Sequence, residues 1–107
     1  MKAVIALGSN LGDPKENLDL ALALLREATD VKSISSYYIT KPVGYEDQPD
    51  FVNAVCIIET ELPAKDLLNM LHGIEKAMGR ERTIKWGPRT LDLDIIQYGS
   101  MLSSAEE

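Results

Sequence analysis

The order in which hydrophobic patterns follow one another along the chain limits its possible folds more than any other feature. Residues 2–8 form a short continuous apolar run, which is typical of a strand covered on both faces. Residues 51–59 alternate between two faces, and residues 91–98 show the same period of two. Residues 32–40 are rich in Ser, Ile, Tyr and Thr, which favours an edge strand. We therefore expect four strands.

Two helices are expected between these strands. The first begins at Asp13, a suitable N-cap, with Pro14 at the first helical position and Glu16 three residues after the cap. The second begins at Pro63 and ends at Gly79. Each helix has one apolar stripe at helical spacing. The stripes are Leu18, Ala21, Leu22, Leu25 and Ala28 in the first helix, and Leu67, Leu71, Ile74 and Met78 in the second.

The order β-α-β-β-α-β is that of the ferredoxin-like α+β fold, a split βαβ arrangement. Right-handed crossovers place both helices on one face of a four-stranded antiparallel sheet. A chain of 107 residues is long enough for one such domain, residues 1–107, and not for two. The other face of the sheet is expected to be open, and we expect the chemistry to lie there.

The distribution of charge favours a small anionic ligand over a long one. The formal net charge of −6 argues against general nucleic-acid binding and against binding to anionic membranes. One segment, residues 80–89, is basic all the same, because it holds Arg80, Arg82, Lys85 and Arg89 against a single acid. The alternative is a solvated surface turn, which is the commoner role of a charge cluster.

The single cysteine, Cys56, excludes an internal disulfide and a multi-cysteine zinc site. It lies in a Val- and Ile-rich run, so a small buried hydrophobic side chain is the default interpretation. The sequence opens without a charged-then-apolar leader, and no apolar run approaches the length of about eighteen residues that a membrane helix needs. We therefore expect a soluble, cytoplasmic protein without a membrane partner.

Residues 91–96 (LDLDII) carry the strongest chemical signal. Period-two geometry sends Leu91 and Leu93 to one face of a strand, and Asp92 and Asp94 to the other, about 6.6 Å apart along the strand. Neighbouring carboxylates repel each other, and a hard cation such as Mg²⁺ resolves the conflict. Two metal ions could lie between and beside them. The alternative is a half-exposed strand whose acids face water.

The loop that leads into these aspartates supports the metal interpretation. Residues 86–90 (WGPRT) bring Arg89 close to Asp92 in the chain, and arginine pairs bidentately with phosphate oxygens. Phosphoryl transfer requires such arginines beside a metal site, because the metals bridge phosphates while the arginines offset charge. The sequence contains no P-loop, protein-kinase or dinucleotide-binding motif.

Three blocks of the chain are more specific when taken together. Residues 8–12 (GSNLG), 48–54 (QPDFVNA) and 86–95 (WGPRTLDLDI) resemble, in order and spacing, the 6-hydroxymethyl-7,8-dihydropterin pyrophosphokinase family. The resemblance runs from residue 3 to about residue 99, and its last block is the most specific. It implies an enzyme of folate biosynthesis that transfers diphosphate from ATP to the hydroxymethyl group of 6-hydroxymethyl-7,8-dihydropterin and releases AMP.

The resemblance also implies roles for individual residues. Asp92 and Asp94 would hold two Mg²⁺ ions, Phe51 would stack on the pterin ring, and Asn53 would bind its polar edge. The pterin pocket would be completed by Thr40, Pro42 and Val43. The implied nucleotide-binding residues are His72, Glu75, Arg82, Trp86 and Arg89, with Trp86 in a loop that closes over ATP. The implied catalytic residues are Arg80, Arg82, Arg89, Asp92 and Asp94.

The family continues past the matched region with a segment that carries a His-Pro pair, an arginine and an aromatic residue, and that covers the pterin. This chain ends at Glu107, where that segment is expected to begin, so the resemblance covers the family core. An impaired fragment that only binds nucleotide or pterin is therefore an alternative function. An RNA-binding ferredoxin-like module is a third, which the acidic charge and the lack of aromatic pairs disfavour. We expect a monomer that acts on small molecules.

Overall fold

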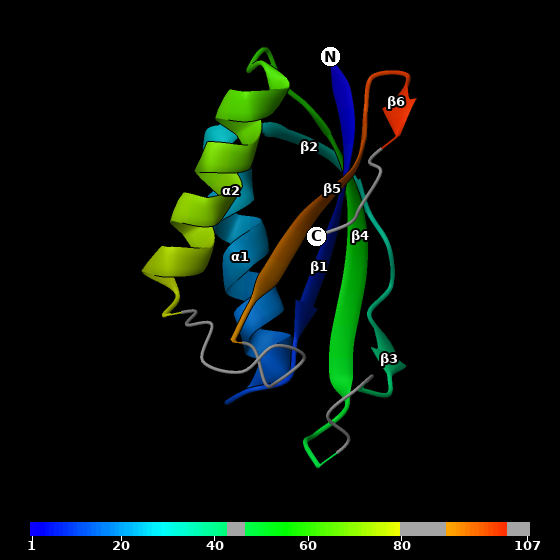
Figure 1. Cartoon of the computed structure of the whole chain (residues 1–107), viewed down its shortest axis with the longest axis vertical. Coiled ribbons are helices and arrows are strands. Elements are labelled where there is room, and N and C mark those ends of the chain that lie inside the picture. The colour runs from blue at the N-terminus through cyan, green and yellow to red at the C-terminus, as the bar shows by residue number, and fades with distance from the viewer. Residues whose placement is uncertain (43–46, 80–89, 103–107) are drawn as a thin grey trace.

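Two helices lie on one face of a single antiparallel sheet in this computed structural model, which describes residues 1–42, 47–79 and 90–102 (Figure 1). The helices are α1 (Pro14–Ala28) and α2 (Ala64–Ala77). The strands are β1 (Lys2–Ser9), β2 (Asp30–Ile34), β3 (Tyr38–Thr40), β4 (Phe51–Glu59), β5 (Asp92–Tyr98) and β6 (Met101–Leu102). The predicted α+β class and the helical layer on one face are both confirmed.

The strand order in the sheet is β2-β4-β1-β5-β6, and β3 also pairs with β4. All of these pairs are antiparallel. The two central strands, β1 and β4, are the first and the third long strands of the chain, as the ferredoxin-like crossover pattern requires. The helices connect β1 to β2 and β4 to β5, and both return across the same face (Figure 1).

The sheet differs from the prediction at its two edges. The single edge strand expected over residues 32–40 is divided into β2 and β3, which pair with opposite halves of β4. Ser35 stays attached to β4 through a hydrogen bond from its N–H to the Val55 carbonyl (2.8 Å), but the chain then carries an extra residue before β3. The sheet also has a short sixth strand, β6, which pairs with Gln97 and Tyr98.

Local signals set the helix ends. Asp13 caps α1, because its Oδ1 accepts a hydrogen bond from the Glu16 N–H at 3.2 Å and Pro14 occupies the first turn. Pro63 lies one position before α2 as its N-cap, and not inside the helix as predicted. Gly79 follows α2 with a φ of +83°, a left-handed conformation that favours glycine. The predicted boundaries are therefore correct to within two residues.

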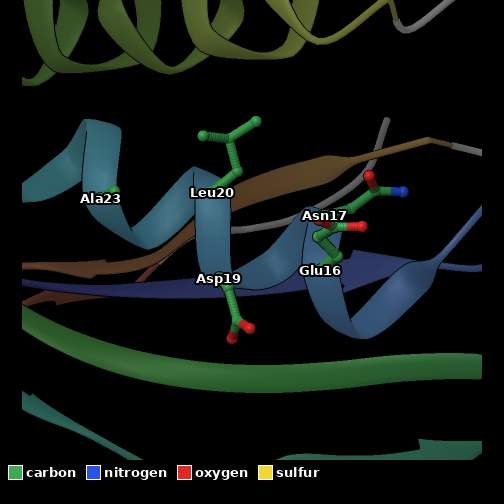
Figure 2. A pocket seen from close by; sticks show the side chains of 5 residues that line it. All are labelled: Glu16, Asn17, Asp19, Leu20 and Ala23. Atoms are coloured by element: carbon green, nitrogen blue, oxygen red, sulfur yellow. The ribbon is translucent and has the colours of Figure 1, made fainter.

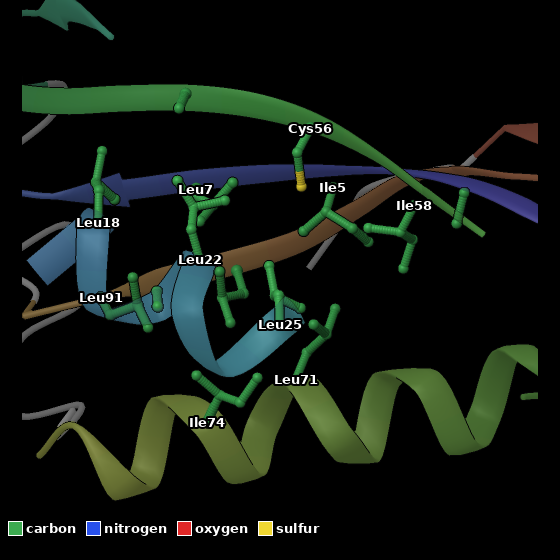
Figure 3. Close-up of a cluster of buried hydrophobic side chains, with 14 of the residues drawn as sticks. Ile5, Leu7, Leu18, Leu22, Leu25, Cys56, Ile58, Leu71, Ile74 and Leu91 are labelled. Atoms are coloured by element: carbon green, nitrogen blue, oxygen red, sulfur yellow. The ribbon is translucent and has the colours of Figure 1, made fainter. Parts of the chain in front are cut away.

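The hydrophobic core fills the space between the sheet and the helices (Figure 3). Alternate residues of β1 and β4 supply its sheet side, among them Ile5, Leu7 and Ile58, and none of these is more than 2% exposed. Cys56 belongs to the same layer, where burial raises the pKa of its thiol to about 11. Cys56 is therefore the buried apolar side chain that the sequence predicted.

A β-bulge interrupts β5 beyond its first half. Ile5 of β1 lies opposite Ile95, whereas Val4 lies opposite Gln97, so Ile96 is an extra residue in β5. Past the bulge, Tyr98 packs against the core, and its hydroxyl donates a hydrogen bond to the Leu62 carbonyl at 2.6 Å. The bulge leaves the alternation of residues 91–95 intact.

Candidate functional site

The face of the sheet opposite the helices carries both aspartates of β5. Leu91 and Leu93 point into the core, at 0% and 2% exposure. Asp92 is half-buried and Asp94 is exposed, which places their side chains on the other face. The prediction that the two carboxylates share the open face is therefore confirmed by the burial pattern of β5.

The register of the sheet aligns three strands across this face. Gly8 of β1 lies opposite Asn53 of β4 on one side and opposite Asp92 of β5 on the other. Because directly opposite residues in an antiparallel pair project to the same face, Asn53 and Asp92 lie on one surface, about 10 Å apart across two strand spacings. The expected pterin residue and the expected metal ligand are therefore neighbours across a single glycine.

Gly8 is a buried glycine that leaves room above the sheet. A methyl group at this position would lie 3.1 Å from Asn53 Oδ1 and 3.8 Å from Phe51 Cδ1. The side chains of Phe51 and Asn53 therefore extend from β4 over the glycine and toward β5. The absence of a side chain at residue 8 lets Asn53 and Phe51 lie over β1, and the three residues form an uncharged floor on this face of the sheet.

Hydrogen bonds fix the orientation of Asn53. Its Nδ2 donates to Thr40 Oγ1 at 2.8 Å, and longer contacts run to the carbonyls of Tyr38 and Phe51. With its amide nitrogen engaged on the β3 side, the carbonyl oxygen Oδ1 faces the space above Gly8. Asn53 therefore presents a hydrogen-bond acceptor to that space, held in place by Thr40.

The turn after β1 is joined to the segment that precedes Phe51. Asn10 is only 2% exposed, and its Nδ2 donates to Gln48 Oε1 at 2.8 Å and to the Pro49 carbonyl at 2.9 Å. This buried amide fixes the approach to β4. The sequence analysis included residues 8–12 in the family resemblance without giving Asn10 a role, because its burial depends on contacts with residues 48 and 49, far away in the chain.

Asn17 joins the same turn to the start of β5. Its Nδ2 lies 2.8 Å from the Leu11 carbonyl, 3.1 Å from Ser9 Oγ and 3.3 Å from the Thr90 carbonyl. Asn10 and Asn17 together connect the β1–α1 turn to both sides of the open face. The sequence analysis missed Asn17, since a polar residue in the first turns of a helix has no distinctive local pattern.

The two predicted nucleotide residues on α2 lie in the helical layer, and their surroundings differ. His72 is exposed on the helix surface. Glu75 is 6% exposed, and its Oε2 accepts a hydrogen bond from the backbone N–H of Leu93 at 2.7 Å. The structure therefore brings Glu75 against β5 between the two aspartates, on the side of the strand that faces the helices.

The remaining predicted residues have different outcomes. Pro42 is half-buried just after β3, next to the exposed Thr40. The other predicted site residues lie outside the described residues. They are Val43, Arg80, Arg82, Trp86 and Arg89.

The chemistry of Asp92 and Asp94 fits a hard divalent cation. Two carboxylates on one side of a strand offer only oxygen ligands, and Mg²⁺ is commonly held by one or two carboxylates while substrate phosphates complete its shell. Among residues 1–42, 47–79 and 90–102, no three His, Cys, Asp or Glu side chains cluster to form a metal site.

A surface hollow also lies on α1, away from the open face of the sheet. It is lined by successive residues of the helix: Glu16, Asn17, Asp19, Leu20 and Ala23 (Figure 2). Apart from Asn17 and the backbone of Glu16, none of these residues takes part in the contacts described above. In the part of the chain that the structure describes, no helix is both long enough and apolar enough to cross a membrane.

Comparison with known proteins identifies similar chains. The family model described as 7,8-dihydro-6-hydroxymethylpterin-pyrophosphokinase matches residues 4–105. The chain is 50% identical over 106 residues to a 2-amino-4-hydroxy-6-hydroxymethyldihydropteridine pyrophosphokinase of Haemophilus influenzae, covering 97% of this chain and 66% of that protein. Proteins with the same name from Pseudomonas aeruginosa and Bacillus subtilis are 44% and 49% identical, covering 94% and 90% of this chain but 64% and 59% of their own lengths. The chain thus spans about two thirds of the length of these curated relatives.

Proposed function

Because this chain belongs to the 7,8-dihydro-6-hydroxymethylpterin-pyrophosphokinase family, we propose that it transfers diphosphate from ATP to the hydroxymethyl group of 6-hydroxymethyl-7,8-dihydropterin and releases AMP. The observation that carries this proposal is the alignment of Asn53, Gly8 and Asp92 across one open face of the sheet. A pterin held at Asn53 has its reacting group within reach of phosphates held at Asp92 and Asp94.

The pterin occupies the floor above Gly8. Phe51 offers a ring face for stacking, and Asn53 Oδ1 accepts a hydrogen bond from the pterin edge while Thr40 holds its amide nitrogen. Pro42 and Val43 complete this pocket. The pocket walls therefore orient the hydroxymethyl group toward β5, and such orientation is a large part of the catalytic effect in phosphoryl transfer.

Asp92 and Asp94 hold two Mg²⁺ ions together with the phosphates of ATP. When bound, these ions would supply positive charge that offsets the phosphate charge opposing the approach of the hydroxyl group. The carboxylates keep their positions because β5 is anchored in the core through Leu91 and Leu93. Arg80, Arg82 and Arg89 contact the phosphates and offset charge that develops on the transferred group.

His72 and Trp86 complete the proposed nucleotide side of the site, where the family resemblance also places Glu75. The net charge of −6 and the uncharged floor at Gly8 suit two small substrates and no nucleic acid. We further propose that the protein acts as a cytoplasmic monomer, in keeping with its need for ATP and a soluble pterin.

The direct test is an AMP-release assay with ATP, Mg²⁺ and 6-hydroxymethyl-7,8-dihydropterin, run beside calorimetry with a non-hydrolysable ATP analogue and with the pterin. AMP and the pterin diphosphate are expected in equal amounts, and removal of Mg²⁺ with a chelator should stop their formation. Binding of both ligands without AMP release would instead support the alternative of a binding-only fragment. Failure to bind either ligand would refute the proposal.

A further inference from the structure

Glu75 occupies a position where the pattern of α2 calls for an apolar side chain. It lies next to Ile74 in the buried surface of the helix, and it is as well buried, with 6% exposure against 8%. Burial of a carboxylate costs free energy, and replacement of a buried charge by an apolar residue often stabilises a protein. The packing of α2 alone therefore gives no reason for an acid at residue 75.

The contact that Glu75 makes points to β5. Its Oε2 accepts the hydrogen bond of the Leu93 N–H at 2.7 Å, at the short end of the range for N–H···O bonds. This N–H belongs to the peptide between Asp92 and Leu93. Glu75 therefore fixes the plane of the peptide that separates the two aspartates.

This part of β5 needs support because it lies at the edge of the sheet. β1 pairs with β5 on one side, whereas β6 pairs on the other side only with Gln97 and Tyr98. Among the described residues, the first half of β5 thus has no strand on its outer side. A strand held on one side only can twist, and a change in twist would alter the directions of Asp92 and Asp94.

From these contacts we propose that Glu75 is a positioning residue, which holds the Leu93 amide and so keeps Asp92 and Asp94 aimed at the metal ions. This inference rests on the proposed metal role of the two aspartates. It differs from the role implied by the family resemblance, in which Glu75 lies near the nucleotide. The carboxylate acts through the backbone of β5, and this role requires an oxygen atom at residue 75 that accepts the Leu93 N–H.

Two neutral variants of similar size separate these roles. Glu75→Gln keeps an oxygen that can accept the Leu93 N–H, while Glu75→Met removes it. Mn²⁺ serves as the metal probe, and its affinity is measured by electron paramagnetic resonance with and without a non-hydrolysable ATP analogue. Loss of a residue that orients a metal ligand typically lowers metal affinity by about 10–100-fold. We therefore expect the Mn²⁺ affinity of Glu75→Met to fall by at least about tenfold. The Mn²⁺ affinity of Glu75→Gln should stay within about threefold of wild type.

Hydrogen exchange of the Leu93 amide, followed by NMR, gives a second measurement without metal. Exchange should accelerate in Glu75→Met and remain slow in Glu75→Gln. Ile74→Val is the matched control, because it weakens the same helix surface without touching the acceptor. If Glu75→Met does not fold, Glu75→Gln alone still decides, since a loss of about tenfold or more in Mn²⁺ affinity contradicts the proposal.

The results distinguish the inference from the function on which it rests. If wild type does not bind Mn²⁺, or binds it as well after Asp92→Ala, the metal assignment itself is wrong and the inference is lost with it. If wild type binds Mn²⁺ through Asp92 but the Gln and Met variants behave alike, only the inference is overturned. An equal loss of ATP-analogue affinity in both variants, with Mn²⁺ affinity unchanged, would assign Glu75 to direct nucleotide contact.

Discussion

The two faces of the sheet are made by the same strands and yet differ in almost every property. In β5, Leu93 is 2% exposed against the helices, while its neighbours Asp92 and Asp94 lie on the opposite face. In β4, Ala54 and Cys56 are buried in the core, while Asn53 on the other face donates a hydrogen bond from its amide nitrogen to Thr40. Each strand therefore packs one set of alternate residues into the core and presents polar residues of the other set on the open face.

This comparison shows how a small domain can carry a polar site without a second core. The helix-covered face is apolar and closely packed, and this packing fixes the positions of the strands. The open face contributes little to packing, so substitutions of its side chains should have little effect on stability. We expect substitutions on the two faces to separate stability from function, and four predictions test this separation in order of decreasing effect.

The largest effect should come from the aspartates. Replacement of Asp92 or Asp94 by Ala should reduce AMP formation by more than about a thousandfold, since metal stabilisation of the transferred charge is worth several kcal/mol. The free energy of unfolding should change by less than about 1 kcal/mol, as measured by urea titration. Glu61→Ala, which removes an exposed acid elsewhere, is the control and should leave both quantities near wild type. Near-normal turnover in both aspartate variants would refute the metal assignment.

The next effect is the converse, on the covered face. Leu93→Ala should lower the free energy of unfolding by about 3 kcal/mol, because it removes a buried side chain and leaves a cavity between β5 and the helices. At low temperature the folded fraction should still bind Mn²⁺. If Leu93→Ala lost metal affinity as completely as Asp92→Ala does, the two faces would not be separable.

A smaller effect is expected from the glycine floor. Gly8→Val would place its side chain against Asn53 Oδ1 and Phe51, so the affinity for the pterin should fall by about tenfold or more, which is about 1.4 kcal/mol. Calorimetry with the pterin measures this loss. The matched control is Gly73→Ala on α2, where an added methyl group meets no atom within 4 Å. Unchanged pterin affinity in Gly8→Val would mean that the ligand does not lie on this floor.

The smallest effect concerns a contact that belongs to neither face. The Tyr37 hydroxyl donates a hydrogen bond to Asp19 Oδ1 at 2.5 Å, and burial together with this bond raises the pKa of Tyr37 to about 12. Because the pKa of Tyr37 is higher in the folded state, its hydrogen bond to Asp19 contributes fully to stability below about pH 10, the ordinary pKa of tyrosine. This contribution is lost as the pH rises through about 12. The melting temperatures of wild type and Tyr37→Phe should therefore differ at pH 9 and converge near pH 12. A constant difference over this range would contradict the assignment.

The parts of the fold that the sequence predicted depend on local patterns. The faces of β5 follow from the alternation of Leu91 to Asp94, and the ends of α1 and α2 follow from Asp13 and Gly79. These signals lie within a few residues of the structure that they determine. The division of the edge strand could not be predicted in this way, because it depends on how residues 35–37 fit against β4, a strand about twenty residues away in the chain.

The same distinction applies to the candidate site. The aspartates and Phe51 were found because their types and spacing are distinctive, although their roles remain predictions. Asn17 was missed, since its importance lies in contacts with Ser9 and Thr90 that join distant parts of the chain. Glu75 was identified through the family resemblance, but its burial against Leu93 could be seen only when α2 and β5 were brought together.

The bulge in β5 has a consequence for how this strand tolerates change. With Ile95 opposite Ile5, and Gln97 opposite Val4, removal of Ile96 would leave a continuous alternating ladder in which every remaining residue keeps its present partner. The extra residue is thus not required to bring Tyr98 to its place. Bulges increase the local twist of a strand, so Ile96 shapes the curvature of β5 immediately beyond its acidic half. A one-residue deletion, usually among the most disruptive changes to a strand, should here straighten the sheet edge while sparing its pairing.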